Sequence, residues 1–565
     1  MPCLTFIIID ITRSTFISIP LERIVGLIYR SLYNLGMQNL IHTLLLFFIL
    51  SSLGCSFKNK KNPETLTVGL SAIPATMDPR FALDAEGMKI GSLIFQSLVT
   101  IGPDMNVVGD AAESWKMEQK GPEFILSFPL KSHLKFSDAT PVTCDDVLFS
   151  IQEYKSDSSP FKSAYDNIKH ARCEQHILTL HLDSYSEKML NSDLPVLKIL
   201  PRKVFLTEAT NSSVINFDDF SYKNLPSYKT ASDRFKEHLV GSGPFAVLSQ
   251  GETTITLRPN THFTKPPQLK KVEFKVIKDD FTRFLQMYRG DLDLAVSTMP
   301  KNKVASLERM DFLDVIRRPG LKMAYILVNF KNSTLSSLKN RQLLFQSFNV
   351  EEVIKYKLEG LGEPASSILT KANPYFNHEL LSLLPERPSE PEELRKQILE
   401  SDAGKAVLLL KTSNTREAVE NAKLLTNQMR QYGFRVRHES YEWGTYFKDI
   451  KEGNYDLATM TWVGAYDPDI YRIALSRKEL PPQGRNRGYY QNPDFDRLVE
   501  AGAQETNTDK RREIYKKAQE IAIKDLAILP LWYEDSITVI HKRVKNYTPS
   551  LNGDYSNLVE ATLTP

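Results

Sequence analysis

The chain has 565 residues, enough for about three or four domain-sized units. Its 71 basic residues nearly balance its 68 acidic residues. Nucleic-acid binding as the main task would favour a concentrated basic surface, so this balance argues against it. The hydrophobic content of 42% is that of a chain with a large globular core.

An apolar run near the N-terminus has the size of a signal-peptide core. Residues 44–50 read LLLFFIL, which is shorter than the roughly 20 residues of a membrane-spanning helix. Small residues at 51–54 and then Cys55 follow, which resembles the bacterial lipobox, where a lipid is attached to the cysteine thiol. We expect an N-terminal extension with a lipoprotein-type signal peptide at 1–54, a polar tether at 55–64, and lipid attachment at Cys55.

Two features of this segment depart from the lipobox pattern. Ser52 stands where Leu is usual, and no Lys or Arg lies between Met37 and the apolar run. A start at Met37 would make residues 1–36 an upstream artefact, whereas the long form would let Arg23 and Arg30 supply the charge, and we favour Met37. A buried apolar helix with an incidental cysteine is the alternative, but the polar linker SFKNKKNPET follows at once and suits a tether.

Periodicity and capping residues predict the elements of the first half of the mature chain. The acidic residues Asp145 and Asp146 follow Thr143 at the positive end of a helix that continues to Tyr154. The other expected elements are a helix at 88–98 and strands at 65–70, 124–130, 135–136 and 177–182, with 135–136 paired to 124–130.

The second half of the chain alternates between strand and helix patterns. We expect strands at 272–277, 292–296, 406–410, 434–440 and 456–462, and helices at 281–289, 415–432 and 445–451. Gly290 and Gly433 end two of these helices. From residue 406 onward the β-α-β-α-β succession predicts an α/β lobe with a substantially parallel sheet.

The residues that carry enzyme or metal chemistry show no recognised pattern. The ten His include no HExxH, and neither GxSxG nor GxxxxGK[ST] occurs, so we expect no enzyme activity, no metal and no cofactor. The cysteines Cys3, Cys55, Cys144 and Cys173 form neither a disulfide framework nor a zinc-site spacing. Cys144 and Cys173 could pair in an oxidising compartment, and their separation in the sequence leaves this open.

Three short motifs occur together between residues 112 and 150. The chain reads AESW at 112–115, KFSDATPV at 135–142 and DDVLFS at 145–150. These motifs resemble the signature of the bacterial extracellular solute-binding protein family that includes the oligopeptide- and dipeptide-binding proteins. Ala139 departs from that signature, which usually has Gly there, and Ala is costly if the turn needs a positive φ.

Further resemblances, such as GSGPF at 241–245 and YRGDLD at 288–293, follow in family order, so the likeness covers about residues 65–560. It implies an α/β, two-lobed periplasmic-binding-protein fold with an additional third domain and a ligand cleft between the lobes. The implied domains are lobe I at 65–98, about 216–325 and about 534–565, domain II at 99–215, and lobe III at 326–533.

The resemblance also implies a function, the solute-binding component of an ABC importer. Such a protein captures oligopeptides in the cleft, closes its lobes by a hinge motion, and delivers the ligand to the membrane permease. We expect a monomer in the periplasm or at the cell surface. Its expected partners are a peptide or peptide-like ligand, ABC permease subunits in the inner membrane, and the lipid bilayer through Cys55.

The resemblance places the ligand site around two tryptophans. Trp443 and Trp462 match two cleft tryptophans of the oligopeptide-binding members, with interdomain packing as the alternative. Tyr325 and Asn329 are expected in the pocket wall. The remaining expected ligand residues directly follow the second tryptophan and are Val463, Gly464, Ala465, Tyr466 and Asp467.

Several positions depart from the peptide-binding pattern. The residue that grips the ligand's ammonium group in peptide binders is an Asp, and here it is Ala465. A one-residue deletion would let Asp467 or Asp469 take the ammonium, or Asp467 is the ordinary residue of an Asp-Pro turn. Two arginines that some members offer to the peptide carboxylate correspond to Ile450 and Thr459, so that clamp is absent.

Two further pairs of residues lie near the expected site. The positions of a disulfide that some relatives carry correspond to Lys322 and Val463. Arg485 and Arg487 are close in the sequence, and we expect them on a solvated surface. Because Ala465 weakens the peptide assignment, we keep open a modified peptide, an opine, a sugar or a metal chelate as ligand, and also a surface sensing or adhesion lipoprotein.

Overall fold

The computed structural model describes residues 6–9, 16–19, 62–102, 105–205, 215–216, 221–222, 239–482, 484–551 and 553–564. The chain divides into two compact units, Met1–Asn62 and Pro63–Pro565. In the first unit β1 (Phe6–Ile9) pairs antiparallel with β2 (Phe16–Ile19). The predicted apolar run at 44–50, Met37 and Cys55 lie outside the described residues. Within the described part, no helix is both long and apolar enough to cross a membrane.

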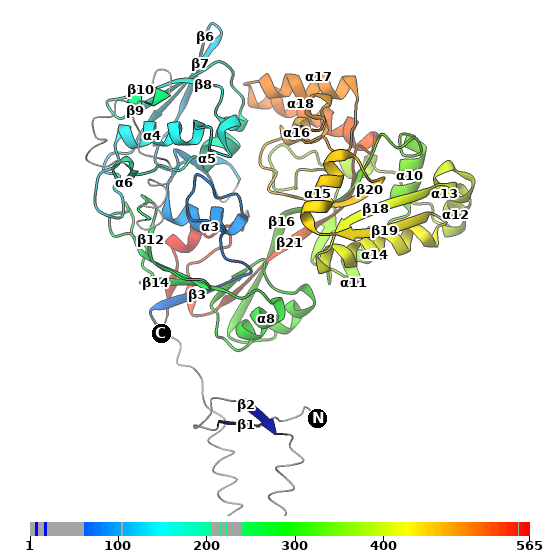
Figure 1. Ribbon diagram of the computed structural model, residues 1–565, viewed down its shortest axis with the longest axis horizontal. Coiled ribbons are helices and arrows are strands. Elements are labelled where there is room, and N and C mark those ends of the chain that lie inside the picture. Colours follow the sequence, from blue (N-terminus) through cyan, green and yellow to red (C-terminus); the bar gives the residue numbers. More distant parts are fainter. Residues whose placement is uncertain are drawn as a thin grey trace, which may run out of the picture. The chain divides into compact units, whose positions relative to one another are not determined.

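One large sheet runs through the second unit (Figure 1). Its eleven strands include β17, which pairs with β21 beside the main path. In spatial order the main path is β12 (Phe245–Gln250), β13 (Thr254–Pro259), β14 (Lys271–Val276), β3 (Thr65–Leu70), β15 (Leu294–Val296), β21 (Leu529–His541), β16 (Leu313–Val328), β20 (Leu457–Val463), β18 (Val407–Ser413) and β19 (Arg435–Tyr441). The strand β17 spans Gly362–Pro364.

The two longest strands, β16 and β21, join the two halves of this sheet. They pair antiparallel from Leu313 opposite His541 to Ile326 opposite Leu529. One end of β21 contacts β15, and the other end of the β16–β21 pair continues into β20. We name the elements on the β15 side the N-terminal lobe and those on the β20 side the C-terminal lobe, and Figure 1 shows β16 and β21 crossing between them.

The N-terminal lobe also carries a separate four-stranded sheet with its own apolar core, formed by residues between Leu98 and Ile199. Helix α4 (Cys144–Lys155) packs on this sheet and begins with the predicted cap, since the Thr143 side chain and Asp146 form a capping box. A disulfide joins Cys144 to Cys173, with 5.4 Å between their Cα atoms. The strands are β6 (Lys116–Lys120), β7 (Glu123–Pro129), β9 (Ile177–Leu182) and β8 (Ile168–Glu174).

The N-terminal lobe also contains further helices and short strands. A π-helical turn, η3 (Met189–Asp193), leads into α5 (Leu194–Val196), and Figure 1 shows α5 on the side that faces the C-terminal lobe. The other elements are α3 (Ala85–Ile94), α6 (Arg202–Phe205), α8 (Asp280–Tyr288), α9 (Val304–Glu308), β4 (Val99–Ile101), β5 (Val107–Gly109), β10 (Ile215–Asn216), β11 (Ser221–Tyr222), β22 (Val544–Lys545) and β23 (Thr562–Leu563).

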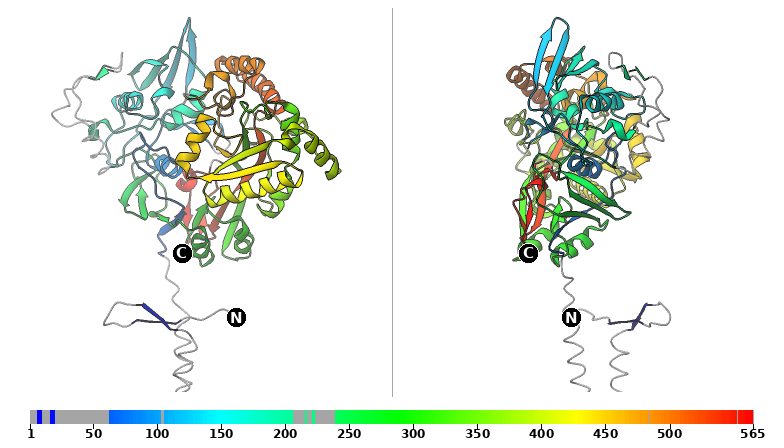
Figure 2. Two further views of the ribbon diagram at one scale, coloured as in Figure 1. Left: turned by 45° about the vertical axis from the view of Figure 1, so that its right-hand side comes forward. Right: turned by 90° about the vertical axis from the view of Figure 1, so that its left-hand side faces the viewer.

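The C-terminal lobe is a layered α/β structure, as predicted. Strand β18 pairs parallel with both β19 and β20. Helix α14 (Arg416–Gln431) lies in one core and α15 (Trp443–Glu452) in the other, so the two helices cover opposite faces of the sheet. Figure 2 shows α14 beside these yellow strands. The other helices are α10 (Leu338–Gln346), α11 (Val350–Tyr356), α12 (Pro391–Glu400), α13 (Asp402–Lys405), α16 (Ile470–Leu475), α17 (Pro493–Gln504) and α18 (Thr508–Lys524).

Two predicted elements were wrong. The helix expected at 88–98 begins three residues earlier, because the Asp84 side chain accepts a hydrogen bond from the Gly87 amide, and it ends at Ile94. Residues 135–136 do not pair with 124–130. Lys135 forms only an isolated bridge with Pro141, whereas β7 lies between β6 and β9.

The apolar cores indicate how the chain divides into domains. Residues 98–199 form one separate core, and the C-terminal lobe contains two others. Each sheet face buries its own set of apolar side chains, which is the ordinary basis for a compact domain. This distribution supports our proposal that residues 99–215 form an additional domain and that residues 326–533 form a separate lobe.

Candidate ligand-binding site

Trp443 occupies the first turn of α15 on the surface of the C-terminal lobe. The Glu442 side chain caps this helix by accepting hydrogen bonds from the amides of Gly444 and Thr445, at 2.7 and 3.4 Å. The Trp443 side chain is 55% exposed, and its ring stacks on Phe447 one turn later, with 5.4 Å between the ring centroids. An exposed indole that stacks on a second ring offers a flat surface to a ligand.

Trp462 lies near the end of β20, directly opposite Met323 of β16. Its ring is half-buried, and its centroid lies 6.4 Å from that of the buried Tyr325. A small cavity of about 10 Å³ lies between them, room for one water-sized group. Its lining residues are Tyr325, Leu327, Ile368, Trp462, Ala474, Arg485, Arg487 and Ile528.

A larger cavity of about 280 Å³ lies beside the same strand end. Its wall includes Trp443, Tyr325 and the β20 residues Thr459, Met460 and Thr461. The structure therefore brings both predicted tryptophans and Tyr325 to two adjoining cavities of one lobe, although Trp443 and Trp462 line different ones.

Charged groups meet at the floor of the larger cavity. The Lys322 ammonium lies 3.2 Å from a carboxylate oxygen of Glu417 and 3.2 Å from one of Glu534, which also binds Lys301 at 2.7 Å. Burial alone would lower the pKa of Lys322, but the carboxylates of Glu534 and Glu417 outweigh it and raise the pKa. These charges compensate one another, so the floor is polar without being strongly charged.

The loop after β20 holds the residues expected to touch the ligand. Val463 is 70% exposed, and Gly464 has a φ of +69°, which lets the chain turn sharply there. The Asn373 amide donates to the carbonyl oxygens of Ala465 and Tyr466, at 3.1 and 2.8 Å. The Ala465 side chain is buried and apolar, so it offers a ligand ammonium group no charge.

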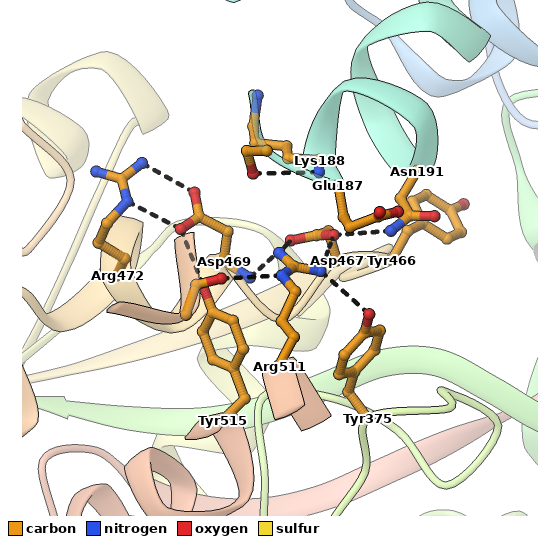
Figure 3. Close-up of polar contacts among 12 residues, drawn as sticks. Glu187, Lys188, Asn191, Tyr375, Tyr466, Asp467, Asp469, Arg472, Arg511 and Tyr515 are labelled. Atoms are coloured by element: carbon orange, nitrogen blue, oxygen red, sulfur yellow. Dashed lines mark hydrogen bonds and ion pairs between the residues drawn. The ribbon is translucent and has the colours of Figure 1, made fainter. Parts of the chain in front are cut away.

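Asp467 lies at the contact between the two lobes (Figure 3). Its carboxylate receives two hydrogen bonds from Arg511 of α18, at 2.8 and 3.0 Å, and one from Asn191 of η3, at 2.9 Å. It is 4% exposed. A similar pair lies beside it, where Asp469 binds Arg472 at 2.8 Å. Both aspartates that we considered for the ammonium role therefore already neutralise an arginine.

Two carboxylates of the N-terminal lobe face this cluster. Burial raises the pKa of Glu187, and Figure 3 shows its side chain beside Asn191. Burial also raises the pKa of Asp193 to about 6 against the opposing charge of Lys188, and Asp467 adds to the increase. Bringing the lobes together thus crowds carboxylates, which Arg511 and Lys188 offset.

The structure assigns clear positions to the other residues singled out from the sequence. Lys322 and Val463 are direct partners across β16 and β20, which agrees with their matching the two halves of a disulfide. Ile450 is fully buried, and Thr459 shares a hydrogen bond of 2.5 Å with the Thr412 hydroxyl. Asn329 lines neither of these two cavities, and its buried amide donates to the backbone carbonyls of Gly453 and Tyr455.

The sequence interpretation missed Arg487. We expected Arg485 and Arg487 on a solvated surface, and Arg485 is exposed, but Arg487 is half-buried and lines the cavity beneath Trp462. The preceding Asn486 explains this, because its buried amide donates to three backbone carbonyls and turns the loop inward. No local pattern marks Arg487 as buried, and only the packing against Phe447 of α15 reveals it.

Metal binding finds no support among the described residues. No group of three or more His, Cys, Asp and Glu side chains is arranged there to hold a metal ion. The chemistry that these cavities offer is therefore stacking on aromatic rings, hydrogen bonding and charge complementarity.

Comparisons with known proteins show which proteins the chain resembles in sequence and in fold. Among curated relatives, the chain is 24% identical over 496 residues to a probable D,D-dipeptide-binding periplasmic protein of Escherichia coli (strain K12). The aligned region covers 86% of this chain and 91% of the relative. Among solved structures, the oligopeptide-binding protein AppA from Bacillus subtilis in complex with a nonapeptide matches with a TM-score of 0.71 at 20% identity, over 89% of this chain and 99% of that chain.

A second structural match carries a different ligand. The binding protein MoaA from A. tumefaciens R10 in complex with mannopinic acid has a TM-score of 0.69 at 20% identity, over 89% of this chain and 100% of that chain. These likenesses confirm the expected two-lobed α/β fold. Residues 106–479, more than half of the chain, match the model described as "Bacterial extracellular solute-binding proteins, family 5 Middle". The chain therefore belongs to the family 5 bacterial extracellular solute-binding proteins.

Proposed function

We propose that this protein captures peptides, or a closely related ligand, between its two lobes and delivers them to the permease of an ABC importer. The observation that carries the proposal is the pair of adjoining cavities at the end of β20, where Trp443, Trp462 and Tyr325 meet. Relatives named for binding dipeptides and a nonapeptide support peptides as the ligand class.

The backbone of β20 supports the same ligand class. Strand β18 pairs with β20 only at Leu457 and Ala458, so the β18-side edge of residues 460–463 has no strand partner among the described residues. An extended peptide can add to such an edge by main-chain hydrogen bonds, while the neighbouring cavities take its side chains. This mode tolerates varied sequences, because the hydrogen bonds come from the backbone.

A thermal-shift panel tests the proposal. A ligand present at about 100 times its Kd adds about 2.7 kcal/mol to the free energy of unfolding, which is a clear shift. We expect free tripeptides to stabilise the wild type, Trp462→Ala to reduce the shift, and Trp115→Ala, which directly precedes β6 of the separate sheet, to leave it unchanged. If free peptides give no shift while blocked peptides or sugars do, the peptide assignment is refuted. Mass spectrometry of the ligand co-purified with native protein gives the identity directly.

A second ligand class is favoured by one specific observation. Ala465 supplies no carboxylate, and Asp467 and Asp469 are already paired with arginines. A ligand without a free ammonium group, such as a modified peptide or an opine, suits this site, and the match to a structure with mannopinic acid supports that class. The same thermal-shift panel distinguishes the two classes.

The remaining expectations concern location and mode of action. We propose that the protein acts by binding alone, as a monomer without enzyme activity, and that a lipid on Cys55 anchors it in the periplasm or at the cell surface. Labelling cells with a fatty-acid analogue tests the anchor. We expect the wild type to be labelled and Cys55→Ala to be unlabelled, and equal labelling of both would refute it. A surface sensing role is the alternative, and intact peptide uptake after gene deletion would favour it.

A further inference from the structure

A half-buried positive charge, that of Arg487, lies beside the small cavity that Trp462 lines. The guanidinium carbon of Arg487 is 4.5 Å from the centroid of the Phe447 ring, which also stacks on Trp443 and has the Lys451 ammonium 5.4 Å from its centroid. Arg487 also lines the small cavity with Trp462 and Tyr325. Arg487 thus contacts Phe447, on which Trp443 stacks, and also lines the cavity of Trp462, although it belongs to the loop between α16 and α17.

This charge has no counter-ion in the described part of the chain. The Arg487 side chain makes no hydrogen bond or ion pair there, and its Nε atom is buried without an acceptor. By contrast, the nearby Arg511 and Arg472 each bind an aspartate. Burial lowers the pKa of Arg487, and the charge of Arg485 lowers it further.

The phenols around Arg487 do not replace a counter-ion. The hydroxyl of Tyr455 donates to the Arg487 carbonyl oxygen at 2.6 Å, and that of Tyr446 donates to the Thr459 carbonyl oxygen at 2.6 Å. Taking a charged group partly out of water is unfavourable unless a partner compensates the charge. The Arg487 charge is therefore one that a bound anion would stabilise, and a carboxylate matches the planar fork of a guanidinium.

We propose that Arg487 binds a carboxylate group of the ligand at the solvent-facing side of the small cavity, where the exposed Arg485 adds positive charge. The inference deepens the proposed function and rests on it. The polarity of the site is thereby the reverse of an ammonium-gripping one, because Ala465 is apolar and Asp467 is neutralised by Arg511. The ligand class that fits is a peptide or peptide-like molecule with a free carboxylate.

Matched ligands test the inference. Trialanine and trialanine amide differ only in the terminal carboxylate, and Ala-Glu-Ala and Ala-Gln-Ala differ only in an acidic side chain. We expect calorimetry to give at least about tenfold tighter binding for one acid than for its amide, and Arg487→Gln to remove that preference. Arg487→Lys should keep part of it, since the charge remains but the fork is lost.

Controls separate a local effect from a folding defect. Arg497→Gln on α17 makes the same change in net charge at an exposed ion pair, and we expect it to leave the preference unchanged. The ratio of acid to amide affinity is read on folded protein, so a lowered melting temperature of Arg487→Gln does not imitate the predicted result. Equal affinities for acid and amide in the wild type, or an unchanged preference in Arg487→Gln, would overturn the inference and leave peptide binding standing.

A probe other than a peptide tests the carboxylate site even if no peptide binds. Acetate is the smallest organic carboxylate, and acetamide is its uncharged counterpart. We expect millimolar acetate, and not acetamide, to raise the melting temperature of ligand-free wild type and to have no such effect on Arg487→Gln. Loss of all peptide binding together with this acetate response would refute the peptide assignment and support the carboxylate site, whereas identical responses to acetate in both proteins would overturn the site itself.

Discussion

At the scale of single residues, Ala139 has a backbone conformation that is unfavourable for a residue with a Cβ atom. The structure gives Ala139 a φ of +72°, a left-handed conformation that favours Gly, and the turn closes with a hydrogen bond from its amide to the Phe136 carbonyl at 3.0 Å. The neighbouring Ser137 amide donates to the Gly241 carbonyl oxygen, which ties this turn to the GSGPF motif. These backbone hydrogen bonds therefore hold Ala139 in a conformation that favours Gly.

We predict that Ala139→Gly stabilises the protein by about 1 kcal/mol, because a left-handed conformation costs an L-residue with a Cβ about that much. The melting temperature of the N-terminal lobe by calorimetry measures it. The matched control is Ala501→Gly in the exposed face of α17, which should destabilise by about 1 kcal/mol, as glycine does within a helix. A decrease in stability for both variants would contradict the prediction.

The ion pair of Arg511 and Asp467 is the second residue-scale feature. Both side chains are almost fully buried, and the pair lies where the lobes meet (Figure 3). We predict that Arg511→Gln lowers the free energy of unfolding by about 3–5 kcal/mol, since it leaves a buried carboxylate without its partner. Urea unfolding followed by tryptophan fluorescence measures the change.

Two variants check the cause of that loss. Arg497→Gln removes an exposed pair and should change stability by less than about 1 kcal/mol. Adding Asp467→Asn to Arg511→Gln removes the buried charge and should recover part of the lost stability. A cost below about 1 kcal/mol for Arg511→Gln alone would show that the pair contributes little.

At the scale of elements, the Cys144–Cys173 disulfide ties the first residue of α4 to β8. The two residues are 29 apart in the sequence, so the cross-link closes a moderate loop of the unfolded chain. Loop-closure entropy then predicts that Cys144→Ser with Cys173→Ser costs about 3–4 kcal/mol, mainly in the four-stranded sheet region. Differential scanning calorimetry measures it, and a reducing agent should destabilise the wild type while leaving the double variant unchanged.

At the scale of the whole molecule, the contact between lobes should respond to pH. Burial raises the pKa of Asp193 to about 6, and Asp467 and Asp469 across the lobe boundary contribute to the increase. Burial is the main cause of this increase, and the part that comes from Asp467 and Asp469 depends on the contact between the lobes, so the closed arrangement holds this proton more tightly than an open one would. Its contribution to closure is complete below the ordinary pKa of 3.8 and is lost as the pH rises through about 6.

We therefore predict that ligand-free protein is more compact at about pH 5 than at about pH 7.5. Small-angle X-ray scattering measures the radius of gyration at the two values. Asp193→Asn should abolish the part of the change that belongs to this carboxylate, and Asp535→Asn, away from this contact, should not. A radius that is the same at both pH values in the wild type would rule the effect out.

The sequence by itself determined local features, namely strand positions and a helix cap. The alternating patterns at 65–70 and 177–182 coincide with β3 and β9, and the cap at Thr143 was correct, because strand alternation and helix capping depend on neighbouring residues. The family likeness added the two-lobed fold and the tryptophan pair. The pairing of residues 135–136 was wrong because sheet partners are chosen by contacts far apart in the sequence.

Only the tertiary structure decided the charges of the site. From the sequence, Asp467 was a candidate for an ammonium group and Arg487 a surface residue. The fold brings Arg511 from α18 and Asn191 from the other lobe onto Asp467, and it half-buries Arg487 beside Phe447, with no counter-ion among the described residues. Whether a charge is available to a ligand depends on which partners and how much water surround it, and chain segments distant in sequence supply both.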